Sequence, residues 1–284
     1  MKLARLMILG AILLSMTTVA NAKQEYTAMP QISVQLWSVK EDVKADFTGT
    51  LSALANMGFT GVEFANEFGE FSGDAAAVKR VLDQLGLKGS GAHISFEQLN
   101  DKNFDETIAF YQTLGVDMLI VGWDERAWHP EGIKEVVFLL NKLAKKLEPF
   151  GIKTGFHNHD HEFNAYNNST YWDYLAQHTS HNVVLQQDVG WTTYAGKDPI
   201  DYVKRYPGRT ITTHYKVKLP KGVTGKLPFI GQDTIDWVGL SKTNIAVGGT
   251  RWFVVEQEEY PNGISPLEAV KISKQGLDKI LNKL

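Results

Sequence analysis

KTGFHNH, at residues 153–159, is the first of four strand-like runs in the second half of the chain. The other three are VVLQQDVGW (183–191), TITTHYKVK (210–218) and WFVVEQEE (252–259). Each run leads through β-branched or aromatic residues to a His, Asp or Glu and is followed by a loop. The runs recur at roughly thirty residues, which is the spacing of strand–helix units in a barrel. Four metal-binding residue types at successive strand ends would meet at one mouth of such a barrel and point to an enzyme.

The first half of the chain continues the alternation, with strand candidates at 32–37, 60–65, 87–93 and 117–122. Helical periodicity is found at 46–58, 74–86, 104–115, 131–151, 169–178, 198–206 and 264–284. Several of these helices stop at a glycine, as a left-handed C′ position prefers: Gly58, Gly86, Gly115 and Gly151. Strand, helix and glycine in repeated order predict an α/β fold, a single-domain (β/α)8 TIM barrel.

An open doubly wound sheet is the alternative to the barrel. No G-x-G-x-x-G follows the first strand candidate, so a dinucleotide site has no support. The stretch 218–247 is the least regular part of the chain, and we interpret it as an active-site loop with a short helix.

An export signal is predicted at residues 1–22. Lys2 and Arg5 precede the apolar run 6–14, and Ala20-Asn21-Ala22 fits a cleavage site after Ala22. The apolar run is shorter than the ~20 residues of a membrane span, and a chain without Cys has no disulfide or lipid-bearing Cys. The expected product is a periplasmic or secreted protein without a membrane anchor, with the barrel at 23–284. An uncleaved amphipathic N-terminus is the alternative.

The composition excludes some partners. The formal net charge of −3 and the absence of a basic stripe predict no nucleic-acid partner. The 262 residues after the signal (284 minus 22) are close to the ~250 typical of this barrel. The sequence leaves open whether the subunits form a homo-oligomer.

The ends of the last three runs carry the strongest chemical signals. Glu256 ends an almost wholly apolar run, where a carboxylate is costly unless it is hydrogen-bonded or binds a cation. Asp188 also closes an apolar run and is either a helix cap or a ligand. His214 and Lys216 share one strand face. A lone His in a strand is usually a satisfied core residue, but its place between Asp188 and Glu256 favours a ligand.

The segment from His157 to Glu162, HNHDHE, is the densest set of ligand types in the chain. His157 and His159 share strand parity if the strand continues that far, and a solvated polar turn is the alternative. Upstream, Gln35, Glu63 and His93 close the first three strand candidates. They are caps or surface residues individually, but together they would line the other half of the mouth.

The chain resembles the xylose-isomerase-like barrel family of sugar phosphate isomerases and epimerases, and more narrowly its exported branch. The resemblance covers about residues 31 to 284. It is carried, in this order, by SVQLWSVKED, GVEFAN, GAHISFEQL, GFHNHDHEF, LQQDVGWTTYAGKDP, HYKVK, IGQDTIDW and VVEQEEY.

The resemblance implies one divalent metal ion held from strands five to eight, and so by Asp188, His214 and Glu256. His157 stands where many members have Glu. Either His157 binds the metal or Glu162 reaches back from the loop, and we favour His157. Trp191 stands where relatives often have His, which suggests that the residues lining the substrate site differ from those of the relatives.

A metal with these ligands suits removal of a proton α to a carbonyl. We expect Mn²⁺, with Mg²⁺, Co²⁺ or Zn²⁺ as alternatives. Glu256 would be ligand and base, His93 and Glu63 would face the substrate, and Lys216 would stabilise negative charge. The expected substrate-binding residues are Gln35, Trp37, His159, Glu162 and Trp191.

The expected substrate is an unphosphorylated sugar or keto-sugar, because the few Arg residues form no evident phosphate clamp. A lyase or hydratase acting on 3-keto-glycosides is the alternative reaction implied by the resemblance. A non-catalytic periplasmic sugar-binding protein stays open, as does a metal-free glycosidase that uses Glu63 and Glu256. Endonuclease IV shares the barrel, but export and net acidity argue against it.

Overall fold

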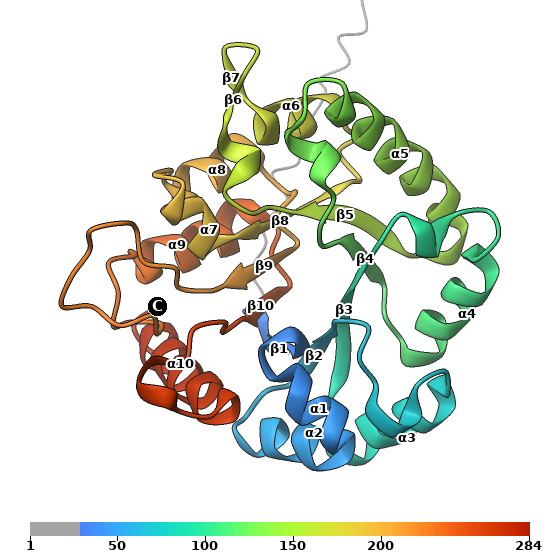
Figure 1. The fold of residues 1–284 in the computed structure, drawn as a ribbon, viewed down its shortest axis with the longest axis vertical. Helices are drawn as coiled ribbons and strands as arrows, with labels where there is room; N and C mark the ends of the chain where they lie inside the picture. Colours follow the sequence, from blue (N-terminus) through green and yellow to red (C-terminus); the bar gives the residue numbers. More distant parts are fainter. Residues whose placement is uncertain (1–28) are drawn as a thin grey trace, which may run out of the picture.

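The structure, a computed structural model, describes residues 29–284; the predicted signal at 1–22 lies outside the described residues. Eight parallel strands close into a barrel in the order β1-β10-β9-β8-β5-β4-β3-β2, and helices surround it (Figure 1). The barrel strands are β1 (Gln31–Gln35), β2 (Gly61–Phe64), β3 (Lys88–Ile94), β4 (Met118–Val121), β5 (Lys153–His157), β8 (Val184–Asp188), β9 (Thr212–Tyr215) and β10 (Trp252–Val255). The predicted single-domain TIM barrel is confirmed.

The helices follow the strands in chain order. They are α1 (Lys40–Ala45), α2 (Phe47–Asn56), α3 (Ala75–Leu85), α4 (Phe104–Leu114), α5 (Gly132–Leu147), α6 (Tyr171–His178), α7 (Val189–Tyr194), α8 (Pro199–Arg205), α9 (Trp237–Thr243) and α10 (Pro266–Leu281). A small antiparallel pair, β6 (Ala165–Tyr166) and β7 (Ser169–Thr170), precedes α6. Within residues 29–284, no helix has both the length and the apolar character needed to cross a bilayer.

The main differences from the sequence expectation lie at the strand ends. β5 stops at His157, so His159 lies in the following loop and is not placed by strand parity. β8 stops at Asp188, whose side chain accepts a hydrogen bond from the Trp191 amide and caps α7. Trp191 is therefore helical. The six residues of α7 are too few to show a helical repeat, which is why the sequence did not reveal this helix.

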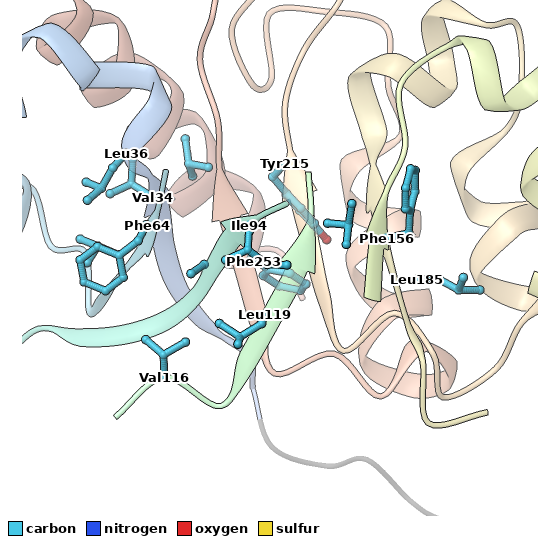
Figure 2. Close-up of a cluster of buried hydrophobic side chains, with 14 of the residues drawn as sticks. Val34, Leu36, Phe64, Ile94, Val116, Leu119, Phe156, Leu185, Tyr215 and Phe253 are labelled. Carbon is cyan, nitrogen blue, oxygen red and sulfur yellow. The ribbon is translucent and has the colours of Figure 1, made fainter. Parts of the chain in front are cut away.

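The strands alternate between two environments. Outward-facing side chains from all eight strands form the core beneath the helices, and Figure 2 shows one from each. They are Val34, Phe64, Ile94, Leu119, Phe156, Leu185, Tyr215 and Phe253. Inside the barrel, Met118, Trp252 and Val254 form a separate small apolar cluster. Most inward positions nearer the C-terminal ends of the strands are polar, with Ile120 on β4 as an exception, and buried polar residues are unusual unless they are paired.

Strand register brings the inward polar residues together. His157 on β5 is opposite Gln186 on β8, and Asp188 is opposite His214 on β9. Gly91 on β3 makes room for Glu63, because a Cβ at this position would lie 2.9 Å from the Glu63 Oε1 atom. The long loop between β9 and α9, orange in Figure 1, has little regular structure, as the sequence indicated.

Candidate metal and active site

Four buried side chains at the C-terminal ends of four neighbouring strands form a group that could hold a metal ion. They are His157, Asp188, His214 and Glu256, and their ligand atoms lie within 4.8 Å of one another. His157 Nε2 is 3.8 Å from Asp188 Oδ2, and His214 Nδ1 is 2.9 Å from Glu256 Oε2. Donors bonded to one ion at about 2.0–2.2 Å have similar separations. The group is the set favoured from the sequence, and Glu162 is not part of it.

Asp188 shows that these residues fit a cation. Its Oδ1 atom accepts the Trp191 amide at 2.7 Å, while the buried Oδ2 atom has no hydrogen-bond partner among the described residues. Burial raises the pKa of this carboxyl to about 7, although the Lys216 ammonium opposes the shift. An unpartnered buried carboxylate oxygen is costly, and a divalent ion between His157 and Asp188 would remove that cost.

His214 lies between two carboxylates. Its Nε2 atom is 2.5 Å from Glu63 Oε2, and its Nδ1 atom faces Glu256. Burial opposes a charge on the ring, but Glu63 and Glu256 outweigh it and raise the pKa of His214 to about 10. A metal at Nδ1 would replace that proton, and Glu63 would continue to hold the ring through Nε2. A carboxylate behind a metal-bound His is a common arrangement that fixes ring orientation and raises ligand basicity.

Glu63 and Gln35 do not face the cavity, contrary to the sequence expectation. Both are fully buried. The Gln35 amide donates to Glu63 Oε2 at 2.8 Å, and the Gln35 carbonyl accepts from the Trp37 amide. Gln186 donates to the other oxygen of Glu63. Glu63 is therefore a support for His214, and it does not pair with Glu256 across an open site as a glycosidase would require.

His93 contacts the same group from β3. A second set that could hold a metal consists of His93, His157 and His214. However, His93 Nε2 is hydrogen-bonded to Gln186 Oε1 at 2.7 Å and is therefore not free to bind a metal. Burial lowers the pKa of both His93 and His157. Both rings are therefore neutral at physiological pH. Gln186 was missed from the sequence because its position inside an apolar run gave no chemical signal.

Lys216 lies beside the two carboxylates of the group. Its Nζ atom is 3.4 Å from Glu256 Oε2 and 3.7 Å from Asp188 Oδ2, and it donates to Glu258. Although burial disfavours its charge, Glu256 and Asp188 raise the pKa of Lys216 above its usual value. The other oxygen of Glu258 accepts from the Trp37 indole at 3.1 Å. The ammonium is thus held against the candidate metal position.

The group opens into a cavity of about 400 Å³. The cavity is lined by Trp37, Ala65, Asn66, His93, Ile94, Ser95, Gly122, Trp123, His157, His159, Glu256 and Glu258. Trp37 and Trp123 are 45% and 55% exposed, so two indole surfaces are free at the rim. Within residues 29–284, no Lys or Arg belongs to this lining. Trp123, Asn66 and Glu258 were missed from the sequence because each lies in the loop after a strand and not at the strand end itself.

The predicted substrate residues divide between the cavity and its surroundings. Trp37 and His159 line the cavity, as expected. His159 is neutral, because burial lowers its pKa to about 3. Trp191 does not line the cavity; its ring packs 5.5 Å from His159, and Lys218 lies 4.3 Å above it.

Glu162 is buried behind His159 and does not contact the cavity. Its Oε2 atom accepts the His159 amide at 2.8 Å, and its Oε1 atom has no hydrogen-bond partner in the part of the chain that the structure describes. Burial raises the pKa of Glu162 to about 8. The carboxyl therefore keeps its proton in the folded protein, whereas in the unfolded chain it ionises with a pKa of 4.5. Stability is lost as the pH rises between these two pKa values.

Glu162→Gln should therefore become progressively more stable than the unmodified protein between pH 5 and pH 8. The amide removes the ionisation penalty and keeps an acceptor for the His159 amide. The expected difference grows by about 1.4 kcal/mol per pH unit, to a few kcal/mol. Urea unfolding with a chelator present measures it. Glu97→Gln is the matched control, because Glu97 also lies in the first turn of a short 3-10 helix but is exposed. A pH-independent difference for Glu162→Gln would contradict the prediction.

The chain is similar in sequence to a known TIM barrel family and to individual proteins. Residues 51–283 match the family model described as xylose isomerase-like TIM barrel. The rhizopine catabolism protein MocC of Rhizobium meliloti is 26% identical over 81% of this chain and 80% of its own length. An inosose dehydratase of Clostridium botulinum is 25% identical over 78% of this chain and 85% of its length.

Solved structures show the same fold. A sugar phosphate isomerase/epimerase from Parabacteroides distasonis superposes with a TM-score of 0.71 at 21% identity, covering 90% of this chain and 97% of that one. An L-ribulose 3-epimerase superposes with a TM-score of 0.63 at 14% identity, covering 90% and 97%.

Proposed function

Because the chain belongs to the xylose isomerase-like TIM barrel family, we propose that it is an enzyme of the sugar isomerase or epimerase type. It would use one divalent metal ion to remove a proton α to the carbonyl of an unphosphorylated sugar or keto-sugar. The observation that carries the proposal is the buried group of His157, Asp188, His214 and Glu256, which opens into the cavity through His157 and Glu256.

The four residues would hold the ion, with Asp188 contributing its unpartnered oxygen. Mn²⁺ accepts such a mixture of nitrogen and oxygen donors, as do Co²⁺ and Zn²⁺, whereas Mg²⁺ favours oxygen alone. When bound, the ion would polarise the substrate carbonyl as a Lewis acid. The exact ion is to be settled by metal analysis of protein purified without added metal.

The remaining chemistry falls to side chains around the cavity. Glu256 is ionised, because Lys216 and His214 hold its pKa well below its usual range despite burial. It would serve as ligand and base together. His93 is neutral and lines the same cavity, so it can exchange a proton with the substrate. Lys216 would counter the negative charge that develops on the substrate oxygen.

The cavity favours a substrate without phosphate. Among the described residues, the charged ones that line it are Glu256 and Glu258, which would repel a phosphate group. Phosphate sites usually present Arg, Lys or clustered backbone amides. Trp37 and Trp123 supply two exposed indole faces, which suit the apolar face of a sugar ring.

A second candidate is a lyase or hydratase that acts on 3-keto-glycosides. It begins with removal of the same proton but ends with loss of a leaving group from the β-carbon. Similarity to an inosose dehydratase over most of the chain favours this alternative. The two candidates differ in product, since only the second releases water or an alcohol.

Turnover in heavy water tests both candidates. We expect an isomerase or epimerase to place deuterium at the α-carbon of its product. We expect a lyase to show a primary isotope effect with α-deuterated substrate and to release water or the glycosidic alcohol. The panel should pair free ketoses, inososes and keto-glycosides with phosphorylated ketoses, and mass spectrometry should follow the label.

Three results would contradict the proposal. Consumption of a substrate with neither label nor isotope effect would indicate direct hydrolysis. Preference for phosphorylated substrates would exclude the proposed substrate class. Tight binding of sugars without any turnover, in protein that contains its metal, would support a non-catalytic binding protein.

We also propose that the chain is exported and cleaved after Ala22. The support is the sequence alone, with its basic start, apolar run and small residues at the cut. N-terminal sequencing of the protein after expression in a bacterium with a periplasm tests it: a mature chain that begins at Lys23 is expected, and an intact N-terminus in the cytoplasm would contradict it.

A further inference from the structure

Gln186 links the candidate metal group to the polar residues behind it. The side chain is fully buried on β8. Its Oε1 atom lies 2.7 Å from His93 Nε2 and 3.1 Å from His157 Nδ1, and its Nε2 atom donates to Glu63 Oε1 at 2.7 Å. One amide therefore contacts two imidazoles and one carboxylate.

The surrounding groups fix the direction of this amide. A carboxylate oxygen accepts hydrogen bonds, so the Gln186 group that faces Glu63 must be the NH₂. The carbonyl oxygen then faces both imidazoles, and a carbonyl can only accept. Each of the two rings must therefore present an N–H to Gln186.

We propose that Gln186 is a positioning residue that sets the tautomers of His157 and His93. His157 would carry its proton on Nδ1, and His93 would carry its proton on Nε2. No contact of Gln186 with substrate or metal is involved. The inference deepens the proposed function, on which its consequences for catalysis rest.

The tautomer of His157 decides whether it can bind a metal. With the proton on Nδ1, the lone pair is on Nε2, which is the atom that faces Asp188 Oδ2 at 3.8 Å. With the proton on Nε2, an N–H would point at the metal position and exclude His157 as a ligand. Outer partners of metal-bound histidines commonly act in this way.

The tautomer of His93 decides what it offers to the cavity. With Nε2 bound to Gln186, the lone pair is on Nδ1. This atom lies beside Gly122, where a Cβ would come within 2.6 Å of it. His93 and Gly122 both line the cavity. The ring thus presents a proton acceptor on the substrate side, in a place that a larger residue than glycine would obstruct.

The direct test is a spectrum of the histidine side chains. We expect ¹⁵N–¹H correlations of the full chain, treated with chelator at pH 8, to show His157 as the Nδ1–H tautomer and His93 as the Nε2–H tautomer. Single substitutions, His157→Gln and His93→Gln, assign the signals. A proton on His157 Nε2 or on His93 Nδ1 would overturn the proposal, and this measurement requires no change at Gln186.

The second test compares two neighbouring glutamines. Gln186→Met has a similar volume but no carbonyl, so it should release the tautomer of His157 and weaken Mn²⁺ binding by about 10–100-fold, measured by calorimetry. Gln187→Met is the matched control. Gln187 is also buried on β8, but it bonds to the Pro199 carbonyl and not to the site, so its affinity for Mn²⁺ should be unchanged.

The outcomes separate the inference from the proposed function. If Gln186→Met keeps both the His157 tautomer and the Mn²⁺ affinity of the unmodified protein, Gln186 does not position these rings. If the unmodified protein binds no divalent ion but shows the expected tautomers, the metal-dependent function fails and the positioning role of Gln186 is supported.

Discussion

Asp188→Ala and Glu256→Gln should each abolish metal occupancy and, with it, turnover. Each change removes a carboxylate ligand from a buried site whose other donors are two imidazoles and one remaining carboxylate. We expect Mn²⁺ affinity to fall by more than the ~10–100-fold typical of losing an outer partner. Metal analysis of the purified variants and calorimetric titration measure the change. Full metal content and activity in either variant would show that the site is misassigned.

Asp188 also caps α7, so a variant that preserves the cap is needed. Asp188→Asn keeps an oxygen that can accept the Trp191 amide but removes the charge, so it should retain the fold and still lose metal. Asp198→Asn is the matched control, because Asp198 caps α8 and lies outside the candidate group. Equal metal loss in both variants would mean that capping, and not coordination, causes the effect.

The fourth ligand is tested by a pair of variants. His157→Ala should lose metal affinity to a degree similar to that of Asp188→Ala, because His157 belongs to the same group. Glu162→Gln should keep the metal affinity of the unmodified protein. The opposite result would assign the fourth ligand to the loop carboxylate. Both side chains are buried, so circular dichroism should first establish that each variant is folded.

Lys216→Met should lower kcat by about 10²–10³ with little change in KM, by analogy with the loss of an oxyanion donor. The ammonium lies 3.4 Å from Glu256 Oε2, close to where the substrate oxygen would gain charge. Mn²⁺ affinity should not fall, since the variant loses the repulsion between the Lys216 ammonium and a second cation. The measurement uses the substrate identified by deuterium labelling.

Lys218→Met is the matched control for this prediction. Lys218 is also on the segment after β9, but its ammonium contacts Glu259 and the Trp191 ring and does not contact the metal group. Its removal should leave kcat close to that of the unmodified protein. A rise in KM alone for Lys216→Met would reassign Lys216 to substrate binding, and a loss of metal would reassign it to supporting the ligands.

The sequence by itself determined the barrel and the candidate ligands. Eight runs of β-forming residues alternate with helical periods, and the short glycine-terminated connections allow a parallel barrel. Polar residues at the ends of apolar runs stand out, because burying a carboxylate such as Glu256 is costly without a partner. Both signals are local, so one chain was enough to expose them.

Only the tertiary structure decided the roles of Gln35, Glu63 and Gln186. From the sequence, Gln35 and Glu63 close strands like the ligands do, and Gln186 is one of two adjacent glutamines. The barrel places Gln35 opposite Glu63 and Gln186 opposite His157, beneath the cavity. How far a residue lies below the mouth of the barrel depends on the stagger between neighbouring strands, and this stagger cannot be predicted from a local sequence pattern.

Of His157 and Glu162, the tertiary structure brings only His157 together with the other candidate ligands. Both are ligand types five positions apart in one polar segment. β5 ends at His157 with its ring inward, while the following turn buries Glu162 behind His159. Where a strand ends is fixed by its hydrogen bonds to neighbouring strands, which are distant in sequence. This pairing therefore determines which of two nearby side chains reaches the site.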